Sequence, residues 1–225
     1  MMTITDGMGR TVTVPAAPDR VVCSGPPGCL RYLTYLQAED HAVGVDDMEI
    51  KENMFDARPY ALANPQFSSL PMIGEFRGND DPEKVVACNP QVIFKTYCTE
   101  ASVADELQEK TGIPVVALQY GDLSKNRALM DQSLRLMGSV MGNDDRAEAV
   151  ITYFDTMTTD LNERTAGGVA EADRQTVFVG GIAHSGPHGF QSTQPTYPPF
   201  IFVNARMFSE GPPDSLRQYC TGEDH

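Results

Sequence analysis

Short apolar runs rich in β-branched residues alternate with helix-like segments through the first half of the chain. Each run is bounded by glycine, by proline or by a polar turn. The runs are residues 20–24, 43–45, 92–94 and 114–118. Continuous apolar strands separated by helices are typical of a parallel sheet that is covered on both faces. This order predicts an α/β lobe with a mostly parallel sheet over residues 1–124.

The expected helices of this lobe are residues 29–37, 82–88 and 101–111. One of them has a clear start signal in the sequence Asp81-Pro82-Glu83. Aspartate is a favoured N-cap, proline fits the first helical position, and glutamate is stabilised by the dipole of the first turn. We therefore expect a helix to begin at Pro82.

A longer helical stretch covers residues 125–165, with a break at 142–145. Its second arm is about 20 residues, or roughly 30 Å at 1.5 Å per residue, which is enough to cross from one lobe to another. A polar linker and a strand from Thr176 predict a second lobe over residues 166–225. Only about 50 residues remain from that strand on, so the second lobe is expected to be incomplete.

The charge balance excludes some classes of partner. The chain has 17 Lys and Arg against 31 Asp and Glu, a formal net charge of −14, and a sequence pI near 4.6. Like charges repel, so binding along a nucleic acid or an anionic membrane is not expected, whereas a basic protein partner is compatible. The first residues lack the pattern of an export signal. Composition leaves open a cytosolic chain or one whose signal is not part of this sequence.

The five cysteines are odd in number and have no CxxC spacing, which argues against a structural zinc site or a dense disulfide framework. They are Cys23, Cys29, Cys88, Cys98 and Cys220. Cys23 and Cys29 bracket a Pro-Gly loop. They are either a pair that joins in an oxidising compartment or small buried residues beside a strand end, and the sequence leaves both possibilities open.

Several segments, in a fixed order over about the first 165 residues, resemble one family. The segments are residues 4–15, 18–22, 81–94, 111–116 and 136–148. They are similar to the substrate-binding proteins of ABC importers that carry ferric siderophores, haem and cobalamin. Each segment is a weak pattern alone, and their shared order is the specific signal.

The resemblance implies a class III periplasmic-binding-protein fold, in which two α/β lobes are joined by one long helix and hold the ligand between them. It implies an extracytoplasmic, non-catalytic protein that delivers an iron chelate, haem or cobalamin to a membrane permease. In the family a surface glutamate on each lobe meets arginines of the permease. Glu83 lies at the position of the first of these, where it also suits a helix N-terminus.

The chain departs from the family at its C-terminal end. Residues 208–225 are polar and match no element of the family, and no second docking glutamate is found. The resemblance therefore covers a chain that is expected to be truncated in its C-terminal lobe. Closed-cleft binding is in doubt for such a chain, and the oligomeric state is left open.

Candidate ligand-binding residues of the second lobe lie in the loop after the strand that begins at Thr176. His184 and His188 are four residues apart, but Gly186 and Pro187 forbid a regular helical metal clamp between them. Loops after strand ends are where ligands of α/β proteins usually bind. The imidazoles and the phenol of Tyr197 are therefore candidates to contact a metal chelate or an anion, or else are solvated loop residues.

In the first lobe the candidates follow three strand ends. Ser24 and Gly25 open a Gly-Pro-rich loop before a helix N-terminus, a place that suits an anion. Arg77, Lys95 and Tyr97 are candidates to meet carboxylates, catecholates or phosphates. Two further arginines are possible helpers, Arg31 and Arg58. A plain surface ion pair is the alternative for each basic residue.

Enzyme motifs are absent from the sequence: it has no GxSxG, HExxH, GxGxxG or P-loop pattern. Asp46-Asp47 and Asp80-Asp81 could bind a hard cation but have the character of turn or cap residues. Two alternatives to a binding protein remain. One is a metal-binding enzyme or metal chaperone that uses His184 and His188, and the other is a truncated relative that only docks to a partner.

Overall fold

The structure is a computed structural model of the chain. It describes residues 1–25, 28–50, 58–76, 79–170, 173–174, 176–180 and 197–207. The chain divides into two compact units, Met1–Thr152 and Tyr153–His225. The division into residues 1–124, 125–165 and 166–225 stays a prediction.

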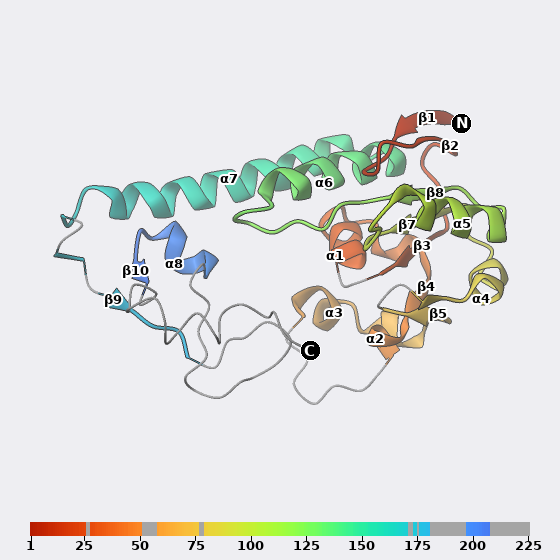
Figure 1. Cartoon of the computed structure of the whole chain (residues 1–225), viewed down its shortest axis with the longest axis horizontal. Coiled ribbons are helices and arrows are strands. Elements are labelled where there is room, and N and C mark those ends of the chain that lie inside the picture. Colours follow the sequence, from red (N-terminus) through yellow and green to blue (C-terminus); the bar gives the residue numbers. More distant parts are fainter. Residues whose placement is uncertain are drawn as a thin grey trace. The chain divides into compact units, whose positions relative to one another are not determined.

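A six-stranded sheet forms the centre of the first unit (Figure 1). Its strands, in spatial order, are β6 (Asn79–Asp80), β5 (Met72–Glu75), β4 (Ala42–Asp46), β3 (Val21–Ser24), β7 (Val92–Lys95) and β8 (Val115–Ala117). All neighbours pair in parallel except β5 and β6, which are antiparallel. The four predicted strands are confirmed. Strands β5 and β6 are differences: β5 was not among the four runs, and at β6 the sequence indicated only a turn.

Helices cover both faces of this sheet (Figure 1). They are α1 (Gly28–Tyr35), α2 (Asp47–Ile50), α3 (Pro59–Ala63), α4 (Pro82–Ala87), α5 (Ala101–Thr111) and α6 (Arg127–Met141). Two 3-10 turns lie at Glu39–His41 and Pro65–Ser69. Helix α7 (Asp144–Ala166) begins in the first unit and ends in the second. In the described ranges, no helix combines the length and apolar character needed to cross a bilayer.

The helix boundaries follow the local sequence signals. The Asp81 side chain accepts hydrogen bonds from the backbone N–H groups of Glu83 and Lys84, both at 3.2 Å, so the predicted N-cap is confirmed. Gly112 and Gly142 end α5 and α6 with φ of 69° and 74°, in the left-handed region that glycine adopts without steric cost. The break predicted at 142–145 thus separates α6 from α7.

The core lies between the sheet and its helices. On the face covered by α4 and α5 the buried cluster is Val22, Ile73, Val85, Ile93, Ala104, Leu107, Val115 and Ala117. On the other face α1 packs against β3 and α6. Burying each large side chain contributes roughly 1.5–3 kcal/mol, which explains why the strands are continuous apolar runs.

A hairpin of β1 (Met2–Thr5) and β2 (Thr11–Val14) is tied to strand β8 by its turn. Asp6 accepts hydrogen bonds from Ala117 N at 3.1 Å and from Arg10 Nη1 at 3.0 Å. Arg10 also donates to the carbonyl of Val115 at 3.1 Å. Asp6 and Arg10 therefore have a structural role.

The second unit contains a short parallel pair, β9 (Thr176–Val177) with β10 (Arg206–Met207), and helix α8 (Pro198–Phe202). Asn204 connects its parts, because its side chain donates to Thr165 Oγ1 at 2.9 Å and to the carbonyl of Asn162 at 3.1 Å. The strand predicted from Thr176 is confirmed over two residues.

Candidate functional site

The parallel strands of the first unit all end at one edge of the sheet, and the loops that follow them come together there. A Cβ added to Gly25 would lie 2.5 Å from the Thr96 carbonyl oxygen, and one added to Gly28 would lie 2.9 Å from the Tyr120 ring. Gly25 also has φ of 98°. Both positions need glycine, and they let the loops after β3, β7 and β8 pack closely.

Arg31 lies at this edge on the first turns of α1. Its guanidinium carbon is 5.1 Å from the centre of the Tyr32 ring and 5.4 Å from that of Tyr120. Its Nη2 donates to the Gly121 carbonyl at 2.7 Å, while its buried Nε has no hydrogen-bond partner among the described residues. Burial raises the pKa of the Tyr32 phenol, which stays neutral at physiological pH. A buried donor without a partner is costly, which makes Arg31 a candidate to bind an acceptor.

Tyr97 follows β7 with an unusual backbone. Its φ is 63°, in the left-handed region, and the residue is 56% exposed. A non-glycine residue in this conformation costs roughly 1–2 kcal/mol, and such strain gathers at functional sites. We call Gly25, Gly28, Arg31, Tyr97 and Tyr120 the carboxyl-edge cluster. It offers one cation and two exposed aromatic rings, and is suited to an anionic ligand with flat groups.

Ser24 and Lys95 lie close together because both contact a third residue, the largely buried Asp80. Lys95 Nζ lies 2.5 Å from Asp80 Oδ2 and 3.2 Å from Ser24 Oγ, and Ser24 Oγ donates to Asp80 Oδ1. The side chain of Lys95 is 1% exposed and that of Asp80 is 8% exposed. Lys95 is thus held in a buried ion pair, and its contact with a ligand stays a prediction.

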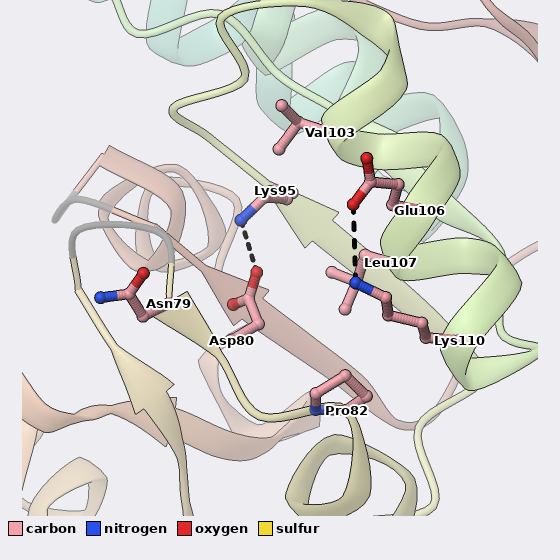
Figure 2. A pocket seen from close by; sticks show the side chains of 8 residues that line it. All are labelled: Asn79, Asp80, Pro82, Lys95, Val103, Glu106, Leu107 and Lys110. Atoms are coloured by element: carbon pink, nitrogen blue, oxygen red, sulfur yellow. Dashed lines mark hydrogen bonds and ion pairs between the residues drawn. The ribbon is translucent and has the colours of Figure 1, made fainter.

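Beside this pair an open pocket of about 300 Å³ lies between β6, α4 and α5 (Figure 2). Figure 2 shows Lys95 directed at Asp80 and Lys110 directed at Glu106, and the second pair is 3.5 Å long. Both lysines of the pocket lining are therefore paired with a carboxylate, which weakens the electrostatic attraction that an anionic ligand would feel there. The carboxyl-edge cluster is the stronger candidate for an anion.

A second polar group surrounds the end of β4. Glu49 Oε1 accepts from Arg58 Nη1 at 2.7 Å and from the Tyr60 hydroxyl at 2.8 Å, and burial raises the pKa of Tyr60. Asp47 accepts from the backbone N–H of Phe76 at 2.9 Å. Arg58, a possible helper in ligand binding, is therefore used to hold this part of the fold.

Asp46 lies beside this group and is 4% exposed. Burial raises its pKa to about 7, and the nearby carboxylate of Glu49 adds to the rise. The backbone N–H of Met48 donates to its Oδ1 at 3.0 Å. The two aspartates 46 and 47 are thus buried hydrogen-bond acceptors, and in the described part of the chain no group of three metal-ligating side chains forms.

The other predicted site residues are placed as follows. Arg77, His184 and His188 lie outside the described residues. Tyr197 precedes α8 in the second unit, where its ring meets the Phe200 ring edge to face at 5.3 Å. Glu83 is exposed in the first turn of α4. The second unit also has a pocket of about 530 Å³ that includes Arg164 and Arg174.

Comparison by sequence finds no family model and no curated protein that matches this chain. Solved structures do match. MolA of Haemophilus influenzae, a molybdate periplasmic binding protein bound to molybdate, is 21% identical with a TM-score of 0.63, covering 78% of this chain and 57% of MolA. The periplasmic catecholate-siderophore binding protein VctP of Vibrio cholerae is 22% identical with a TM-score of 0.56, covering 78% of this chain and 56% of VctP.

An ABC transporter solute binding protein of Sulfurospirillum deleyianum is 20% identical with a TM-score of 0.63, covering 98% of this chain and 67% of that protein. At these identities the similarity shows the fold. The chain has the α/β fold of periplasmic solute-binding proteins, with a mostly parallel sheet and two long helices, and the predicted fold class is confirmed. It spans a little more than half the length of MolA and VctP.

Proposed function

We propose that this chain is the extracytoplasmic solute-binding component of an ABC importer, which binds a small metal-containing ligand without turnover and presents it to a membrane permease. The proposed ligand is an iron chelate of the siderophore class, with haem and cobalamin as related candidates. Support comes from the fold, which is shared with VctP and MolA, and from the carboxyl-edge cluster.

The observation that carries the proposal is the state of Arg31. Its guanidinium lies over two tyrosine rings and has a buried Nε without a hydrogen-bond partner in the described part of the chain. A guanidinium binds carboxylate and catecholate oxygens through two parallel N–H groups, and exposed rings stack on flat ligand groups. The exposed rings of Tyr97 and Tyr120 are available for that contact.

Ligand binding is tested by the melting temperature of the 225-residue chain. We expect a ferric siderophore to raise it, because a ligand that binds only the folded state stabilises that state by mass action. Haem, cobalamin, molybdate and free divalent metals form the rest of the screen, and the ligand should be recovered unchanged. Chemical conversion of the ligand would contradict the proposal, as would a cooperative melt that no chelate shifts.

Replacing Arg31 with alanine should weaken binding of the chelate about tenfold or more, since a hydrogen bond to a charged group contributes roughly 1.5–3 kcal/mol. Arg31→Lys keeps the charge but lacks the planar fork, and should recover only part of the affinity. Isothermal titration measures both. Arg135→Ala, at an exposed arginine of α6 that is paired with Glu148, is the matched control and should bind as the parent does. Unchanged affinity in Arg31→Ala would remove this residue from the site.

Variants of Tyr97 distinguish its effect on the stability of the protein from its effect on ligand binding. Tyr97→Gly relieves the left-handed strain while removing the ring, so we expect a melting temperature equal to or above that of the parent, with weaker chelate binding. Tyr97→Ala keeps the strain and loses the same ring. Thermal melts with and without chelate compare the two. If both variants bind as tightly as the parent, Tyr97 has no part in the site.

Glu83 is the proposed contact to the permease. Charge reversal by Glu83→Lys should leave the chelate-induced melting shift unchanged and abolish uptake of labelled chelate by cells that carry the importer, because like charges would then meet at the interface. Glu163→Lys, another exposed glutamate in a helix, is the control for charge alone. Normal uptake with Glu83→Lys would exclude this docking role.

A further inference from the structure

Two buried thiols meet at the start of α1. Cys23 is in β3 and Cys29 in α1, and each residue is 1% exposed. Both are reduced in this structure. Cys23 pairs with Phe94 between the parallel strands β3 and β7, and the Cys29 Sγ lies 3.5 Å from the Phe94 carbonyl oxygen. Both cysteines thus lie against Phe94, and a disulfide between them would bring their sulfurs to about 2.05 Å from each other.

The folded protein protects these thiols from reaction. Burial raises the pKa of Cys29, and the neighbouring Cys23 and Asp46 raise it further. Only a thiolate attacks a disulfide, so this pair reacts slowly once the chain is folded. An oxidant gains access while the chain folds, before β3 and α1 close over the sulfurs.

We propose that Cys23 and Cys29 are a disulfide site, which a disulfide oxidant joins during folding. The thiolate of one cysteine attacks the oxidant and forms a mixed disulfide, releasing one thiol of the oxidant. The thiolate of the other cysteine then displaces the second. Two S–H bonds are lost and one S–S bond forms, while two electrons and two protons pass to the oxidant, which leaves as two thiols.

A disulfide between Cys23 and Cys29 would constrain the backbone of the carboxyl-edge cluster. It would close the segment 24–28, which contains Gly25 and Gly28, and it would anchor the first turn of α1 two residues before Arg31. A cross-link over so short a loop stabilises mainly by restricting the unfolded chain. The inference does not depend on the proposed function, because it rests on the positions of the two cysteines beside Phe94.

The test uses the full chain with Cys88, Cys98 and Cys220 replaced by alanine, so that Cys23 and Cys29 are the remaining thiols. The protein is unfolded in urea with reductant and refolded in a buffer of glutathione and excess glutathione disulfide. Free thiols are then alkylated under denaturing conditions, and peptides are mapped by mass spectrometry without reduction. A second sample, refolded without the oxidant, gives the reduced protein.

We expect the oxidised sample to have no alkylated cysteine and one intramolecular cross-link between the peptides of Cys23 and Cys29. Its melting temperature should exceed that of the reduced sample by roughly 4–8 °C. Cys23→Ala added to this background should show no cross-link and no such difference. The proposal is overturned if both thiols are alkylated after oxidative refolding, or if cross-links form only between molecules. The cooperative melt of each sample shows whether it has folded.

Discussion

Replacing Asp80 with alanine lowers the free energy of unfolding by about 3–5 kcal/mol, the usual cost of leaving a buried charge without its partner. The Lys95 side chain is 1% exposed, and Asp80 Oδ2 lies 2.5 Å from its Nζ. Without that carboxylate the ammonium group keeps, among the described residues, the hydroxyl of Ser24 as its hydrogen-bond partner. Urea unfolding followed by circular dichroism measures the change.

A double variant tests the effect of removing both buried charges together. Asp80→Asn combined with Lys95→Met removes both charges and should be clearly more stable than Asp80→Ala, because no buried charge then lacks a partner. Glu106→Ala, which removes the exposed partner of Lys110 in the same pocket, is the control and should change stability little. An Asp80→Ala variant as stable as the parent would show that the ion pair contributes nothing.

Asp46→Asn makes the protein more stable at pH 8 and nearly unchanged at pH 4. The pKa of the Asp46 carboxyl is about 7 in the folded protein, against an ordinary value of 3.8. Below about pH 4 it is protonated in both the folded and the unfolded state. Between pH 4 and 7 the unfolded chain ionises while the folded chain holds its proton, so stability of the parent falls over this range and is constant above it.

The difference of about three pKa units corresponds to a stability gap on the order of 4 kcal/mol between variant and parent at pH 8. The asparagine oxygen can still accept the bond from Met48 N–H. Glu49, Asp47, Arg58 and Cys29 are the charged or titratable neighbours of Asp46, and their presence in both proteins makes the comparison specific. Urea unfolding at pH 4, 6 and 8 gives the gap, and a gap that does not widen with pH would exclude a buried, protonated Asp46.

Local signals in the sequence predicted the parts of the fold that depend on neighbouring residues. Asp81-Pro82-Glu83 placed the start of α4, and the glycines after α5 and α6 placed their ends. Continuous apolar runs identified the central strands because both faces of the sheet are covered. The two-residue strand β6 was missed, since its pairing with β5 is tertiary and its residues are turn formers.

The candidate site was less predictable from the sequence, because its contacts also join residues that are far apart along the chain. Lys95 was identified as a cation near a ligand, but its partner Asp80 comes from β6, which is not a neighbour of β7 in the sheet, and no local pattern records this contact. One of the two rings beside Arg31, that of Tyr120, comes from far along the chain. The left-handed backbone of Tyr97 has no sequence signature, because tyrosine rarely adopts it.

The docked hairpin also protects the end of the sheet from self-association. Strand β8 is an edge strand, and an edge with open N–H and C=O groups recruits strands from other molecules. Here those groups are occupied: Gln108 and Arg10 bond the N–H and carbonyl of Val115, while Asp6 and the backbone of Gly7 bond those of Ala117. Loss of Asp6 would therefore expose a template for aggregation as well as loosen the hairpin.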